Sequence, residues 1–211
     1  MLHSLAKRIA FFLFGAGEYP IEVYIYGLEL IISSLIGESI VLILGLILGR
    51  LIETIIFIVL IKFIRIYSGG FHAKTYIVCN IVFIISYSVS LFVSRCLANI
   101  SPDIIFIIMI ATILVTVLAM AIMAPIENVN KPISLERRKV LKIKAIVAAL
   151  TTGFIFMTGY LLYRLQEMII IIPGYLTIVI SMLAEIGIYG KEKDYEEDSK
   201  RNIGESGCKD S

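Results

Sequence analysis

The sequence predicts an all-α fold: a polytopic membrane helical bundle of about six transmembrane helices, preceded by an N-terminal interfacial helix. First, 59% of the 211 residues are hydrophobic and the mean hydropathy is +0.94, which is more apolar surface than one soluble core of this length can bury. Second, the charged residues, 17% of the chain, gather in short clusters between long apolar runs. Third, these runs lack the period-2 alternation of barrel strands, so in lipid they must be helices.

Six stretches are long and apolar enough to span, or nearly span, a bilayer, because about 20 helical residues cover a hydrocarbon layer of ~30 Å. These stretches are Gly27 to Leu48, Leu51 to Ile66, Tyr76 to Ser94, Ile104 to Met123, Ala145 to Leu162, and Met168 to Tyr189. The second is short and contains Glu53 and Lys62, so it is the weakest of the six.

The first 20 residues resemble a signal peptide only superficially. Lys7 and Arg8 precede a short apolar stretch, but no small-residue cleavage site follows and Glu18 intervenes. We expect residues 1–20 to form an amphipathic helix that lies on the lipid headgroups. Residues 21–189 then form the membrane domain.

The distribution of Lys and Arg predicts the orientation. If six spans alternate from a cytoplasmic N-terminus, 16 of the 19 basic residues face the cytoplasm, and only Arg50, Arg95 and Arg164 face outward. The prediction is a multi-pass protein of the cell membrane, with residues 190–211 as a charged, disordered cytoplasmic tail. The basic loop from Lys131 to Lys144 would contact anionic membrane lipids. The net charge of +2 is too small to indicate nucleic-acid binding.

Small residues four apart mark faces where helices approach closely. Gly45 and Gly49 have this spacing in the first span, and Ala145, Ala149 and Gly153 have it in the fifth. Packing within the bundle is the favoured interpretation, and a homodimer seam is the alternative.

Candidate chemistry concentrates between the second and third spans, where His72 precedes Cys79 by seven residues. On one continuous helix the two would lie ~10 Å apart along the axis, so the chain must bend for them to meet. A cysteine near a helix N-terminus and beside a histidine is suited to act as a nucleophile. The three cysteines show no CxxC spacing, which speaks against a disulfide framework or a metal site, and no cofactor is expected.

Three neighbours of this pair fit the chemistry of acyl transfer. Gly69 and Gly70 would break the helix before His72 and leave backbone N–H groups free to bind an oxyanion. Arg65 offers a fixed positive charge for the oxyanion or for a substrate carboxylate. Taken alone, the His–Cys pair favours ordinary structural roles, for the histidine in a loop and for the cysteine in a membrane helix, over catalysis.

The segment R-x-Y-S-G-G-F-H-A-K-T, with a cysteine seven residues after the histidine, resembles the signature of the AgrB family of membrane cysteine endopeptidases, which process quorum-sensing pro-peptides. The resemblance extends to Tyr26-Gly27-Leu28-Glu29, to Ala124-Pro125 with Lys131-Pro132, and to the basic loop before the last two spans. It implies that His72 and Cys79 are the catalytic pair, that Arg65 and Gly70 are required, and that residues 21–189 form a peptidase domain.

The resemblance also implies the substrate: a short AgrD-like precursor peptide with an acidic C-terminal part that the enzyme removes. Cys79 would form an acyl-enzyme thioester, and displacement by a thiol or hydroxyl of the substrate would give a cyclic thiolactone or lactone. The basic loop from Lys131 to Lys144 could alternatively dock the acidic part of the precursor. A peptide transporter or channel, suggested by six spans and by an interrupted helix at Pro173-Gly174, and a non-catalytic membrane scaffold are the competing functions.

Two acidic residues in the first span require explanation. Glu29 is expected to support the site by orienting it, with Lys62 or Arg65 as candidate partners. Glu38 lies deeper, and we expect it to be neutral or paired within the bundle rather than catalytic.

Overall fold

The computed structural model describes residues 2–14, 21–68, 75–126, 135–163 and 165–187, and every regular element in these ranges is helical. The helices are α1 (Leu2–Phe14), α2 (Ile21–Ile47), α3 (Leu51–Ser68), α4 (Tyr76–Leu97), α5 (Pro102–Met123), α6 (Leu135–Tyr163) and a last helix, Gln166–Gly187, that begins as the 3₁₀ turn η1 (Gln166–Ile170). The predicted all-α membrane fold is confirmed.

Among the described residues, five helices are long and apolar enough to cross a membrane: α2, α4, α5, α6 and the last helix. The exception is α3, the predicted second span, which carries Glu53, Lys62 and Arg65 within 18 residues. At 1.5 Å per residue α3 is ~27 Å long, close to the thickness of the hydrocarbon layer. The chain therefore has the architecture of a multi-pass membrane protein with five clear spans and one further apolar helix, α3, that carries three charged residues and buries eight of its 18 residues.

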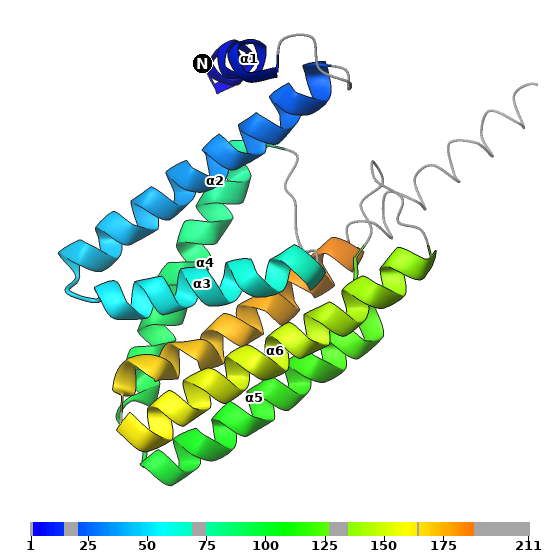
Figure 1. Ribbon diagram of the computed structural model, residues 1–211. Coiled ribbons are helices and arrows are strands. Elements are labelled where there is room, and N and C mark those ends of the chain that lie inside the picture. The colour runs from blue at the N-terminus through cyan, green and yellow to red at the C-terminus, as the bar shows by residue number, and fades with distance from the viewer. Residues whose placement is uncertain (1, 15–20, 69–74, 127–134, 164, 188–211) are drawn as a thin grey trace, which may run out of the picture.

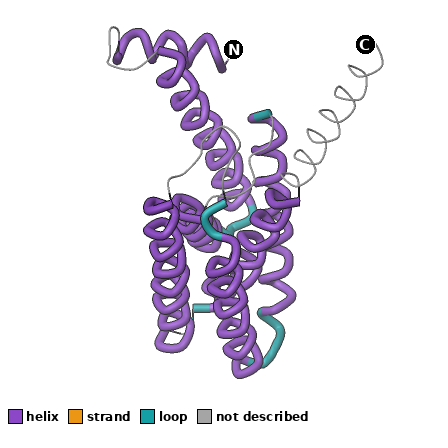
Figure 2. Tube along the Cα trace, turned by 90° about the vertical axis from the view of Figure 1, so that its right-hand side faces the viewer, coloured by secondary structure: helices purple, strands orange, loops and turns teal. Residues whose placement is uncertain are grey.

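The helices alternate in direction and pack as two groups (Figure 1). One group contains α3, α5, α6 and the last helix, which lie side by side. The other contains α2 and α4, which pack on each other, while α3 contacts both groups. Seen from the side, α1 lies across the end of α2, away from the main bundle (Figure 2). This arrangement makes α3 the centre of the fold and leaves α2 at its edge.

Polar residues inside the bundle are joined in pairs. Thr54 of α3 and Tyr87 of α4 share a hydrogen bond of 2.7 Å, and the Tyr87 ring packs edge-on against Phe57, with centroids 5.6 Å apart. Thr152 of α6 and Tyr175 of the last helix share a second hydrogen bond, of 2.8 Å. Because buried hydroxyl groups need partners, these bonds specify which helices are neighbours.

The small residues of α2 do not all act as predicted. Gly45 faces the Thr54 side chain so closely that a Cβ at position 45 would collide with it. Gly49 lies beyond the end of α2, in the turn to α3, with φ +66° and open space where a Cβ would be. The prediction that Gly49 packs against a helix is wrong, because glycine here permits a left-handed turn.

In α6 the predicted small-residue face does lie against other helices. Ala145 and Ala149 are fully buried, and a Cβ at Gly153 would lie 2.9 Å from the Ile113 side chain of α5. These residues pack within the chain, as favoured from the sequence. A homodimer seam stays an untested alternative.

α1 packs on α2 through its small residues. Ala6 and Ala10 are buried against Ile25, whereas Leu5 and Phe12 are exposed, Phe12 by 89%. The face that was expected to lie on the headgroups is thus directed away from the rest of the protein, as an interfacial helix requires.

Two sequence-based expectations are wrong in this region of the fold. The last ten residues of the expected loop from Lys131 to Lys144 belong to α6, which begins at Leu135 because Leu, Glu, Arg and Lys are all strong helix formers. The last helix is not interrupted at Pro173-Gly174, since Pro173 lies in its first α-helical turn, where a missing N–H is tolerated. One of the two observations that suggested a transporter, the interrupted helix, is therefore absent.

The bundle also separates the described basic residues by end. Lys62 and Arg65 lie near the end of α3, and a basic cluster opens α6, at the same end of the bundle. Arg50 and Arg95 lie at the opposite end, before α3 and in the last turn of α4. The structure thus shows the two-sided arrangement that the orientation argument assumes.

Candidate functional site

Cys79 lies at the end of the first turn of α4. Thr75 caps this helix: its backbone is extended and its hydroxyl accepts a hydrogen bond of 3.4 Å from the Val78 N–H. The Cys79 N–H donates to the Thr75 carbonyl at 3.1 Å, the first bond of the helical ladder. The helix starts at Tyr76, as predicted. Its N-terminal end, with unpaired N–H groups and a partial positive charge, therefore lies one turn from the thiol.

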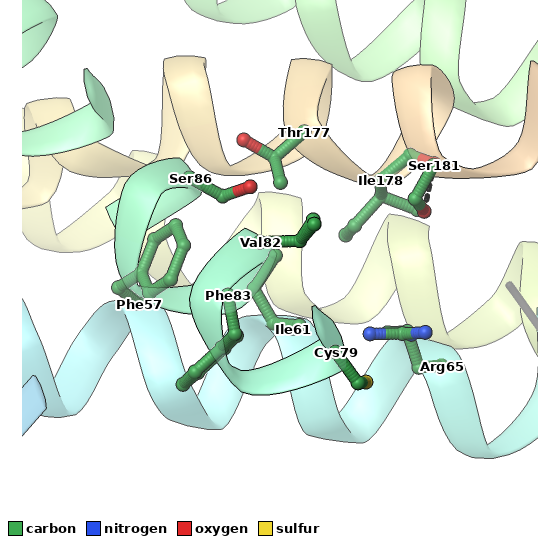
Figure 3. A pocket seen from close by; sticks show the side chains of 10 residues that line it. All are labelled: Phe57, Ile61, Arg65, Cys79, Val82, Phe83, Ser86, Thr177, Ile178 and Ser181. Carbon is green, nitrogen blue, oxygen red and sulfur yellow. Dashed lines mark hydrogen bonds between the residues drawn. The ribbon is translucent and has the colours of Figure 1, made fainter. Parts of the chain in front are cut away.

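Arg65 of α3 approaches Cys79 from the neighbouring helix. Both side chains are partly buried, and both line the same two cavities. Figure 3 shows the guanidinium and the thiol beside each other at one end of the smaller cavity. The structure thus brings together two of the residues predicted to form the site.

The two cavities meet at Cys79 and differ in size. The smaller, ≈ 40 Å³, lies between α3, α4 and the last helix and includes Phe57 and Ile178 in its lining. The larger, ≈ 440 Å³, lies between α2, α3 and α4. The larger volume falls within the range of ligand sites in proteins, ~300–1,000 Å³.

The larger cavity has a polar strip of uncharged side chains, beside apolar residues and three charged ones. Ser33 and Ser34 of α2 and Asn80 of α4 line it, and the Asn80 amide donates to the Ser33 hydroxyl at 3.3 Å. Gly37 permits this approach, because a Cβ there would lie 2.7 Å from Asn80 Oδ1. A cavity of this kind can bind a ligand that is partly apolar and needs hydrogen-bond partners.

An ion pair lies in the wall of this cavity. It involves Glu38, the last residue of α2 that lines the cavity. Lys62 Nζ of α3 lies 2.6 Å from Glu38 Oε1 of α2, and the Glu38 side chain is only 15% exposed. The expectation that Glu38 is paired within the bundle is confirmed. A paired carboxylate is a structural link between the helices, not an obvious catalytic base.

Glu29 has other partners than the sequence suggested. Its carboxylate accepts from the Tyr76 hydroxyl at 2.8 Å and lies 2.6 Å from His3 Nδ1 of α1. Pairing with Lys62 or Arg65 is wrong, because Lys62 is held by Glu38, about two helical turns deeper along α2. Through Tyr76, Glu29 contacts the start of the helix that carries Cys79.

Several predicted residues lie outside the described ranges. His72, Gly69 and Gly70 belong to the segment 69–74, between the last residue of α3 and the cap of α4, and the tail 190–211 is also outside. Cys96 is exposed near the end of α4, far along the helix from Cys79. Within the described ranges, no group of three or more acidic, His or Cys side chains could hold a metal ion.

Sequence reasoning missed the polar strip, although its periodicity was visible. Tyr76, Cys79, Asn80 and Phe83 have the i, i+3, i+4, i+7 spacing of one helical face, and all four line the larger cavity. The cavity-lining residues of α2, from Leu30 to Glu38, have the spacing i, i+3, i+4, i+8, which also follows one helical face. Adjacent residues such as Cys79 and Asn80 point about 100° apart on a helix, but both line this one wide cavity.

Comparisons with known proteins agree with the resemblance noted in the sequence. A model of the family described as "AgrB: Accessory gene regulator B" matches residues 7–186. A Clostridium perfringens (strain 13 / Type A) protein named "Putative AgrB-like protein 2" is 30% identical over 144 residues, 66% of this chain and 67% of its own length. A "Putative AgrB-like protein" of strain SM101 / Type A is 32% identical over 120 residues, 56% of each chain. No solved structure matches the chain significantly.

Proposed function

The chain belongs to the accessory gene regulator B (AgrB) family, and from this premise we propose that it is a membrane cysteine endopeptidase that removes the C-terminal part of an AgrD-like quorum-sensing pro-peptide. The observation that carries the proposal is the position of Cys79, on the wall of a ≈ 440 Å³ cavity, one turn into α4 and beside Arg65.

This position suits a nucleophile. The positive end of the α4 dipole and the Arg65 guanidinium both favour negative charge at the thiol, and the thiolate is the form that attacks a carbonyl. The cavity offers room for a peptide next to the sulfur.

The remaining roles follow from the chemistry of acyl transfer. His72 accepts the thiol proton and later gives it to the leaving amine. The negative charge of the tetrahedral oxyanion is stabilised by Arg65 and by backbone N–H groups at Gly69 and Gly70. Glu29 supports the site through its hydrogen bond with Tyr76, at the first residue of α4.

The first reaction breaks the scissile C–N bond, releases the acidic C-terminal part, and leaves the N-terminal fragment as a thioester on Cys79. If a thiol of the same fragment then attacks this thioester, a cyclic thiolactone leaves and Cys79 regains its proton; a hydroxyl gives a lactone. One thioester replaces another in the first case, so the step is close to thermoneutral and depends on excluding water.

The site lies at the cytoplasmic end of the bundle in this proposal. Basic residues cluster at that end of the described helices, and cytoplasmic segments of membrane proteins are enriched in Lys and Arg. The first turns of α6 would contact anionic lipid headgroups there, and the exposed apolar face of α1 would lie in the same interface.

The test is co-expression with an AgrD-like precursor that carries a C-terminal epitope tag. Wild type should release the tagged fragment, and Cys79→Ala and Cys79→Ser should not, because a serine hydroxyl is far harder to ionise than a thiol. Cys96→Ala is the matched control and should cleave normally, since Cys96 lies near the other end of α4. Cleavage by Cys79→Ala would refute the proposal.

A further inference from the structure

We infer that the larger cavity binds the segment of the substrate that precedes the scissile bond, as an extended peptide of about three to four residues that lies against α2, α3 and α4. This inference rests on the proposed function, since it takes Cys79 as the nucleophile. It assigns substrate-binding roles to Ser33, Ser34 and Asn80.

The length follows from the geometry of α2. The cavity is lined by α2 from Leu30, at the level of Tyr76, to Glu38. Eight residues of helix rise ~12 Å. An extended peptide advances ~3.3 Å per residue, so three to four residues fill this distance. The ion pair of Glu38 with Lys62, whose charged atoms lie 2.6 Å apart, is at the far end of the cavity.

The polar strip can supply the hydrogen-bond partners that such a peptide needs. An extended peptide between membrane helices leaves its N–H and C=O groups without water, and each unsatisfied group costs several kcal/mol. Side chains that both donate and accept hydrogen bonds can satisfy these groups whatever the peptide sequence. Ser33 and Ser34 of α2 and Asn80 of α4 provide them, since Ser33 and Asn80 keep hydrogen-bonding capacity beyond the 3.3 Å bond that joins them.

Size and the course of the reaction decide which part of the substrate occupies the cavity. Charge does not decide it, because the Glu38 carboxylate is paired with Lys62 and Arg65 also lines the cavity. The smaller cavity, ≈ 40 Å³, has no room for a peptide segment. The acyl segment, unlike the leaving segment, stays bonded to Cys79 in the intermediate and gains from a site that excludes water.

The experiment measures alkylation of Cys79 by acetyl-(Ala)n chloromethyl ketones with one to four alanines, in the full chain with Cys96 and Cys208 replaced by alanine. The thiolate forms a C–S bond, chloride leaves, and the thiol proton passes to solvent. Iodoacetamide, which has no peptide, reports the intrinsic reactivity of the thiol. We expect the second-order rate constant to rise on the order of tenfold from one to three or four alanines, because bound residues hold the ketone near the sulfur.

Two serines of α2 provide a matched pair of variants. Both are exposed, but Ser34 lines the cavity and Ser39 does not. Ser34→Phe should abolish the dependence on peptide length while leaving the iodoacetamide rate within about twofold of the parent. Ser39→Phe should retain the full dependence. Asn80→Ala adds no bulk to the cavity, and it should reduce the dependence of the alkylation rate on peptide length.

The outcomes separate this inference from the proposed function. A rate that does not depend on peptide length, or a dependence that survives in Ser34→Phe, overturns the binding assignment even if Cys79 is required for cleavage. Peptide processing that persists in Cys79→Ala instead refutes the endopeptidase itself, whatever the alkylation rates show.

Discussion

Replacing Gly45 with alanine tests how tightly α2 and α3 are packed. A Cβ at Gly45 would collide with Thr54 Oγ1 and lie 2.8 Å from Thr54 Cβ. Thr54 cannot easily turn away, because its hydroxyl is 2.7 Å from both the Arg50 carbonyl and the Tyr87 hydroxyl. The two helices must therefore separate, or the buried hydrogen bond with Tyr87 must break.

Both the separation of the helices and the loss of the hydrogen bond lower the free energy of unfolding. Overpacking of a well-filled contact costs ~1–3 kcal/mol, and loss of a buried hydrogen bond leaves an unsatisfied group at ~1–3 kcal/mol. Alanine also favours a helix over glycine by ~0.5–1 kcal/mol, which offsets part of this cost.

Gly27→Ala in the same helix isolates the collision, since a Cβ at Gly27 meets nothing within 4 Å. Because the helix-propensity gain is common to both variants, Gly45→Ala should be less stable than Gly27→Ala by ~1–3 kcal/mol. Reversible unfolding in mixed detergent micelles, followed by circular dichroism, measures the difference. Equal stability of the two variants would show that α2 does not pack on α3 through Gly45.

Four further outcomes are expected. Arg65→Lys keeps a positive charge but loses the planar guanidinium, so precursor cleavage should fall at least about tenfold while membrane insertion persists; cleavage at the wild-type rate would remove Arg65 from the site. Glu29→Ala removes the acceptor for the hydroxyl at the start of α4, so cleavage should slow several-fold in enzyme assays, and an unchanged rate would argue against a supporting role. Tyr87→Phe breaks a buried hydrogen bond and should lower the unfolding free energy by ~1–3 kcal/mol without changing the reactivity of Cys79 toward iodoacetamide. Cys208, and a cysteine introduced at Ser134, should resist an impermeant maleimide in intact cells, and labelling from outside would reverse the proposed orientation.

Much of the fold could be predicted because lipid restricts the available structures. Apolar runs of about 20 residues have to be helices in a bilayer, so the starts and ends of α4 and α5 follow closely from hydropathy and from Thr75, Pro102 and Pro125. Hydropathy could not locate the start of α6, because its first turns are basic and extend beyond the apolar stretch.

The sequence by itself determined the class of the protein, the two-sided distribution of its basic residues, and the place of Cys79 in the first turn of a helix, because hydropathy, charge and helix capping all act over a few neighbouring residues. It could not determine which polar side chains from different helices would meet. Glu29 contacts Tyr76 and His3, and Glu38 contacts Lys62, because of how α2 lies on α1, α3 and α4. Only the tertiary structure decided that the faces of α2, α3 and α4 enclose a cavity at Cys79. The physical reason is that the rotation and tilt of packed helices depend on contacts between residues far apart in the chain, such as Gly37 with Asn80 and Gly45 with Thr54.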